Sequence, residues 1–75
     1  MSEEQFTSSL REFVHRKPFL PFLVELVDGR RIIVDYPSVA FSGGSAGFLS
    51  EDDGLIDFSY DRVRNMAYIT AETKL

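Results

Sequence analysis

The dipeptide Asp28-Gly29 separates two runs of apolar residues, and this arrangement strongly limits how the chain can fold. An Asp-Gly pair flanked by alternating apolar residues is the strongest short-range signal for a β-hairpin. The segment from Phe19 to Pro37 is therefore predicted to form two antiparallel strands that reverse direction near residue 28.

The register of this hairpin follows from the need for one apolar face. A two-residue turn would pair Leu26 with Arg31 and would mix apolar and charged side chains on both faces. A three-residue loop over 27–29, with Gly29 as a left-handed bulge, instead pairs Glu25 with Arg31 across the ladder. We predict this bulged register, which gives a core face of Phe22, Val24, Leu26, Ile32, Val34 and Tyr36. The other face is amphipathic and carries Leu23, Glu25, Arg31, Ile33 and Asp35. This second face can be covered either by a helix or by a partner protein.

The N-terminal segment 2–16 is predicted to be a helix. Ser2 is suited to the N-cap position, and Gln5 stands where it completes a capping box. An apolar stripe at helical spacing follows, made of Phe6, Leu10, Phe13 and Val14. Pro18 disfavours helical geometry at the residue before it and so ends the helix.

The rest of the chain predicts a small α+β domain that is mainly β. The expected elements begin with a short continuation of the second strand or a third strand over 39–41, followed by a flexible connection over 42–47. Phe48-Leu49 and an acidic turn over 51–54 then lead to 55–58 as another hairpin, a tight turn or 3₁₀ segment follows over 60–63, and the last strand is 65–70. Residues 1–75 then form one domain, with an antiparallel sheet of about five short strands over 19–70 and a frayed tail over 71–75. Because the sheet must protect its edges, we expect a small, partly open barrel.

Composition excludes several classes of function. The 75-residue chain has no cysteine, so disulfides and thiolate metal sites are absent, and we expect a cytoplasmic protein. No apolar run approaches the ~20 residues of a membrane-spanning helix, and the first residues lack the features of a secretory signal. The net charge of −4 disfavours non-specific binding to nucleic acid or to an anionic membrane.

Residues 16–37 resemble a family of short bacterial proteins with an Arg-x-Pro-Phe-x-Pro-Phe segment, an Asp-Gly-Arg turn and a later proline. The matching residues here are Arg16-Lys17-Pro18-Phe19-Leu20-Pro21-Phe22, Asp28-Gly29-Arg30 and Pro37. The resemblance covers about a third of the chain and implies a common fold without implying an activity.

A looser resemblance is to Sm-like RNA-binding barrels, which also run from a helix into five strands. Asp28-Gly29 matches their turn after the first strand, and Val63-Arg64-Asn65 echoes their second motif. Asn65 stands where that family has glycine, and the Asp-x-x-x-Asn loop that lines its RNA pocket has no counterpart after Tyr36. The resemblance therefore implies the barrel and not the RNA pocket.

Four arginines are the candidate ligand site: Arg30, Arg31, Arg62 and Arg64. If the turn over 60–63 meets the hairpin end, these side chains form one basic patch that suits single-stranded nucleic acid or an acidic protein segment. The alternative is dispersed surface ion pairs, such as Glu25 with Arg31 and Asp61 with Arg64, and we favour this alternative because such pairs are commonplace.

Other candidate sites have simpler interpretations. His15 has no nucleophile or acid partner in a recognisable motif, and a histidine at a helix C-terminus complements the helix dipole. Glu51-Asp52-Asp53, with Asp57 beyond, lacks the ligand spacing of a calcium loop. The glycine-rich segment 42–47 lacks the lysine of a phosphate-binding loop. We therefore expect no catalytic, cofactor-binding or metal-binding residues.

These observations predict a non-enzymatic interaction module that associates with itself or serves as an accessory subunit. Apolar residues on both hairpin faces, strand edges that need cover and a core of marginal size all favour protein contacts. The alternative is a nucleic-acid-binding barrel that uses the four arginines.

Overall fold

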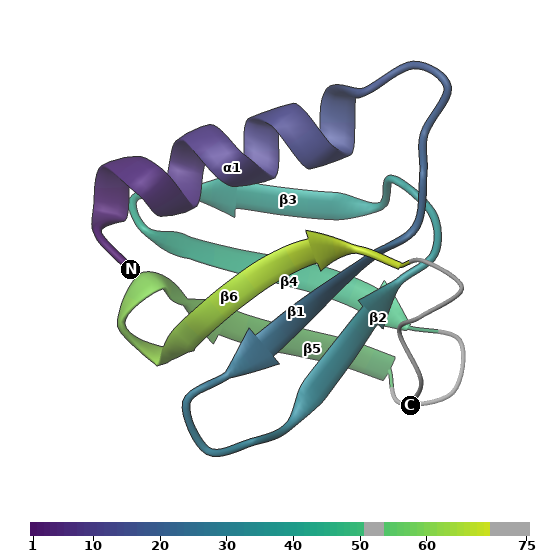
Figure 1. Ribbon diagram of the computed structural model, residues 1–75. Coiled ribbons are helices and arrows are strands. Elements are labelled where there is room, and N and C mark those ends of the chain that lie inside the picture. The colour runs from purple at the N-terminus through teal and green to yellow at the C-terminus, as the bar shows by residue number, and fades with distance from the viewer. Residues whose placement is uncertain (51–53, 70–75) are drawn as a thin grey trace.

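The computed structural model describes residues 1–50 and 54–69 and has one helix followed by six antiparallel strands (Figure 1). The elements are α1 (Glu3–His15), β1 (Phe22–Leu26), β2 (Arg31–Val34), β3 (Val39–Ser42), β4 (Ser45–Ser50), β5 (Gly54–Ser59), the 3₁₀ turn η1 (Tyr60–Arg62) and β6 (Val63–Tyr68). The strands form two sheets, ordered β2-β1-β6 and β3-β4-β5. The mainly β, α+β class and the partly open arrangement are thus confirmed, and the described strands do not close into a complete barrel.

Helix α1 begins with the predicted capping box. The Ser2 side chain accepts a hydrogen bond from the Gln5 backbone N–H at 3.1 Å, and the Gln5 side chain accepts one from the Ser2 N–H at 3.3 Å. The buried part of the apolar stripe is Phe6, Leu10 and Val14, while Phe13 is half-buried. The helix ends at His15, close to the predicted end, because Arg16 has extended backbone geometry.

The β1–β2 hairpin has the predicted bulged register. Glu25 pairs with Arg31, and the Leu26 N–H donates to the Arg30 carbonyl oxygen at 2.8 Å. Gly29 has φ of 92°, in the left-handed region that glycine occupies without a steric cost. Along both strands, buried residues alternate with more exposed ones as predicted.

Strand β4 is longer than predicted: Phe48-Leu49 forms an arm of the predicted hairpin with 55–58, but the strand begins at Ser45. The segment 42–47 was expected to be a flexible connection, but Ser42 pairs directly with Ser45 across a two-residue turn. Gly43 and Gly44 have φ of 59° and 82°, and two successive positive φ angles define a type I′ hairpin turn. The glycines that suggested flexibility are therefore the residues that make a tight β3–β4 hairpin, and six strands form instead of about five.

The core lies between the two sheets and under α1. It contains, among others, the fully buried residues Phe6, Leu10, Phe22, Val24, Val34, Phe48 and Val63. Figure 1 shows α1 along one side of the molecule, next to β3, with the two sheets facing each other below it. The chain passes from one sheet to the other at two places, residues 35–38 and η1.

The predicted turn over 60–63 is the 3₁₀ turn η1, and it is bonded to both sheets. The Tyr60 N–H donates to the Gly44 carbonyl oxygen at 2.9 Å, and the Arg62 carbonyl oxygen accepts from the Val27 N–H at 2.8 Å. Strand β6 then starts at Val63, earlier than the predicted start at residue 65.

Two predictions lie outside the described residues: the acidic turn at 51–53 and the frayed tail over 71–75. Within the described part of the chain, no helix is both long and apolar enough to cross a membrane.

Candidate functional site

The hairpin end and η1 meet, and this contact brings three of the four candidate arginines to one region. Arg30 lies at the end of the β1–β2 loop, and Arg62 is bonded through its carbonyl to Val27. The Arg64 guanidinium donates to the Val27 carbonyl oxygen at 3.2 Å. Arg31 lies on the outer face of its sheet, where its Nε is 3.8 Å from a Glu25 carboxylate oxygen. One of the two predicted ion pairs is therefore present.

The second predicted ion pair, Asp61 with Arg64, does not form. Asp61 instead accepts a 2.6 Å hydrogen bond from the Ser59 hydroxyl, and this bond holds the pKa of the Asp61 carboxyl below its usual value. The Arg64 side chain is directed to the backbone of the hairpin loop rather than to a carboxylate.

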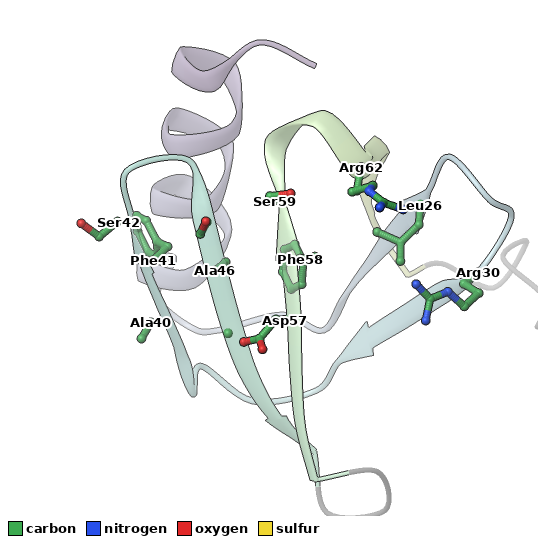
Figure 2. A pocket seen from close by; sticks show the side chains of 12 residues that line it. Leu26, Arg30, Ala40, Phe41, Ser42, Ala46, Asp57, Phe58, Ser59 and Arg62 are labelled. Carbon is green, nitrogen blue, oxygen red and sulfur yellow. The ribbon is translucent and has the colours of Figure 1, made fainter.

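An open groove of about 740 Å³ lies beside these arginines (Figure 2). We call it the β5 groove; it is lined by Leu26, Arg30, Ala40, Phe41, Ser42, Ser45, Ala46, Gly47, Asp57, Phe58, Ser59 and Arg62. Figure 2 shows strand β5 between the remainder of its sheet on one side and Arg62, Arg30 and Leu26 on the other. A volume of this size is in the range of ligand-binding clefts.

The two arginines of the groove differ in how they are paired. The Arg30 Nε is 2.9 Å from an Asp28 carboxylate oxygen, and the Arg30 N–H also donates to Asp28 at 3.0 Å. That backbone hydrogen bond, with help from the charges of Arg30 and Arg62, lowers the pKa of the Asp28 carboxyl. The exposed Arg62 guanidinium makes no ion pair or hydrogen bond with any described residue. Arg62 is thus the cation of the groove that is free to bind a ligand.

Small side chains form the part of the groove that belongs to β3, β4 and β5. The ladder places Ala40, Gly47 and Asp57 in one row across the three strands, and Ser42, Ser45 and Ser59 in the next row of the same face. A β-carbon on Gly47 would lie 3.2 Å from an Asp57 carboxylate oxygen, so the glycine leaves room for the acid to lie over the strand. Sequence reasoning missed this surface because it depends on the first part of β4, residues 45–47, which was expected to belong to a connection.

Strand β5 also presents an unpaired edge to the groove, because β4 is its one hydrogen-bonded neighbour within the described sheets. The Tyr60 N–H bonds to Gly44, and backbone groups along an antiparallel strand alternate in direction. Counting back from Tyr60, the backbone groups of Phe58 and Ile56 therefore point to β4. Those of Leu55, Asp57 and Ser59 point to the open side.

Two leucines form an exposed apolar pair at one end of the same sheet. Leu49 and Leu55 lie directly opposite each other on β4 and β5, and they are 56% and 66% exposed. On the other sheet, Ile33 is 40% exposed and Leu23 is half-buried. The one α-helix of the described residues, α1, packs near β3 and η1 and leaves the amphipathic face of the hairpin uncovered.

The remaining candidates from the sequence are His15 and the acidic group of 51–53 with Asp57. His15 is exposed, with its ring 6.3 Å from that of Phe41. Of the predicted acidic group, Asp57 lies in the β5 groove and 51–53 lie outside the described residues. Among the residues that the structure describes, no three His, Cys, Asp or Glu side chains are grouped so as to hold a metal ion.

Comparisons with known proteins give no relative from which a function could be transferred, since no family model, curated protein or solved structure matches this chain.

Proposed function

We propose that this protein is a non-enzymatic interaction module of the cytoplasm that acts through protein contacts and associates with itself. The observation that carries the proposal is the Leu49–Leu55 pair, which is exposed beside the unpaired edge of β5. A contiguous apolar patch next to an open strand edge is the kind of surface that soluble proteins cover by association. The absence of cysteine supports the cytoplasmic placement.

The energetics favour association through this patch. Complete burial of a leucine side chain contributes about 1.5–3 kcal/mol, and two copies of the chain would bury four leucines in one contact. Part of this gain offsets the loss of translational and rotational freedom on binding. The resulting complex is therefore expected to form at micromolar concentrations rather than to be permanent.

Replacing Leu55 with serine is expected to shift the protein towards the monomer, because it removes the more exposed leucine of the pair. Sedimentation velocity between about 1 and 100 μM measures the change, which should be at least tenfold in the dissociation constant. Leu20→Ser is the matched control, since Leu20 is also exposed but belongs to the segment between α1 and β1 and not to the β4–β5 ladder.

A monomeric wild-type protein at 100 μM would contradict self-association. Equal effects of the Leu55 and Leu20 substitutions would show that the Leu49–Leu55 pair is not the contact surface. Circular dichroism of each variant separates these outcomes from unfolding, because both substituted positions are exposed.

A second candidate function is nucleic-acid binding, and the meeting of Arg30, Arg62 and Arg64 at one end of the molecule favours it. A single strand could place its phosphates along these arginines. The net charge of −4 works against this function, since it reduces non-specific attraction to a polyanion.

A fluorescence titration with short RNA and DNA strands at low salt tests the second candidate. Each of Arg62→Ala and Arg64→Ala should weaken binding and reduce its salt dependence, because each removes about one phosphate contact. Arg31→Ala is the control, since Arg31 pairs with Glu25 on another face. No binding, or equal binding by all three variants, would exclude this function.

A further inference from the structure

The β5 groove combines three features that together suit a binding site for a polypeptide. It contains Arg62, whose guanidinium makes no ion pair or hydrogen bond with another described residue; it reaches the edge of β5 at residues 57–59, where the described residues supply no further strand; and it has a volume of about 740 Å³. We propose that the groove binds an extended acidic segment of a partner protein, which adds to β5 as a further strand. This inference rests on the proposal that the module acts through protein contacts, but it does not require self-association.

The β5 groove meets strand β5 at the end near η1. Of β5, Asp57, Phe58 and Ser59 line the groove, whereas β3 and β4 supply six of the other lining residues. A strand added to the edge of β5 would therefore have one of its ends in the groove.

The backbone of β5 can form main-chain hydrogen bonds with an added strand of any sequence. The outward N–H and C=O groups of Leu55, Asp57 and Ser59 form the half-ladder that an added strand completes. Recognition of extended peptides by an open sheet edge obtains its affinity from these main-chain hydrogen bonds and its specificity from alternate side chains. A nucleic acid has no such backbone, and this favours a polypeptide.

The charges define which segment fits. The Arg62 guanidinium is exposed and makes no ion pair or hydrogen bond with another described residue, and Arg30 lies on the same side of β5 (Figure 2). A carboxylate placed there makes charge-assisted hydrogen bonds with Arg62, and these are the strong class of hydrogen bond. Asp57 lies on the side of β5 that faces β4, so the acidic residue of the segment must lie near η1 and not over Asp57.

An apolar position completes the pattern. Leu55 is 66% exposed at the far end of β5 from Arg62, beside Leu49. A segment that extends along the whole edge can place one apolar side chain at this leucine pair and one carboxylate at Arg62. The preferred ligand is therefore an extended peptide with apolar and acidic residues at opposite ends.

The probe is a fluorescein-labelled peptide, acetyl-Glu-Thr-Val-Thr-Val-Thr-amide, titrated with the whole chain and followed by fluorescence anisotropy. We expect saturable binding that weakens about tenfold in Arg62→Gln and by less than twofold in Arg31→Gln, because Arg31 lies outside the groove. A peptide with lysine in place of glutamate should bind at least tenfold more weakly than the original. Equal binding by wild type and Arg62→Gln would overturn the proposal.

Strand addition has its own test, which leaves the protein unchanged. Successive N–H groups of an extended peptide point to opposite edges. One probe is N-methylated at the residues whose N–H groups would face β5, and a second probe is N-methylated at the intervening residues, whose N–H groups would face away from it. One methylated peptide should lose binding at least tenfold while the other retains it. Equal binding by both would reject addition to the β5 edge. Displacement of the peptide by a short oligodeoxythymidylate at lower concentration would assign the groove to nucleic acid instead.

Sedimentation of the same samples separates this proposal from self-association. A monomer that binds the peptide supports the peptide site and contradicts self-association. If the protein self-associates at high concentration but does not bind the peptide at low concentration, where it is monomeric, the result contradicts the peptide site and leaves self-association intact.

Discussion

Replacing Phe22 with alanine will lower the free energy of unfolding by about 3–5 kcal/mol. The Phe22 ring is fully buried on β1, the central strand of its sheet, with ring centroids 4.7 Å from Phe13 and 6.1 Å from Phe19. A 75-residue domain has a total stability of only about 4–11 kcal/mol, so this single change removes a large part of it. The strands around β1 are fixed by hydrogen bonds and cannot collapse to fill the cavity.

Urea unfolding followed by circular dichroism measures this loss, with Phe19→Ala as the control. Phe19 belongs to the same ring cluster but is half-buried, so its truncation should cost only about 1–2 kcal/mol. Equal losses for the two substitutions would show that β1 is not the centre of the packing described here.

Gly44→Ala is expected to cost about 2–4 kcal/mol, more than any other single methyl addition in the glycine turns. The substitution has two separate effects: Gly44 has φ of 82°, which strains any other residue, and its β-carbon would lie 2.9 Å from the Tyr60 ring. Glu3 lies 3.1 Å away on the other side, so the turn is enclosed between η1 and the start of α1.

Gly43→Ala separates the two effects, because Gly43 has φ of 59° but no atom within 4 Å of the added carbon. It should lose only the backbone part, about 1 kcal/mol. In a Tyr60→Ala background the cost of Gly44→Ala should fall towards that of Gly43→Ala. An unchanged cost in that background would place the origin of the loss elsewhere. Thermal or urea unfolding of the wild type, the three single variants and the Tyr60→Ala/Gly44→Ala double variant decides this.

Local features of the fold could be predicted from the sequence because short-range chemistry determines them. The capping box at Ser2 and Gln5 needs only a spacing of three residues. The bulged hairpin needs only Asp28-Gly29 and the rule that one face be apolar, and the observed pairing of Glu25 with Arg31 agrees with it.

The first part of β4 was missed because local composition and long-range pairing point in opposite directions. Serine, alanine and glycine over 42–47 have low strand propensity, and the glycines alone suggest a loop. The segment becomes a strand because β3 and β5 bond it on both sides, and propensity cannot register partners that are distant in sequence.

The candidate site was also only partly predictable from the sequence. The sequence identified the four arginines and one condition for their proximity, contact between the turn at 60–63 and the hairpin end. The hydrogen bond from the Val27 N–H to the Arg62 carbonyl oxygen provides this contact, and it brings Arg30, Arg62 and Arg64 to one region. The row of small side chains and the open edge of β5 could not be found, because they depend on where β4 begins and on the order of strands in the sheet.

The double attachment of η1 has a consequence for how the molecule opens. Tyr60 is bonded to one sheet and Arg62 to the other, so loss of this turn releases the Val27 and Tyr60 amides in the same event. Their hydrogen exchange with solvent should therefore proceed at a common rate, although the two residues are far apart in sequence. A ligand that immobilises Arg62 would slow the hydrogen exchange of both amides. The exchange rate of the Val27 amide, on the β1–β2 hairpin, would then report on binding beside β5.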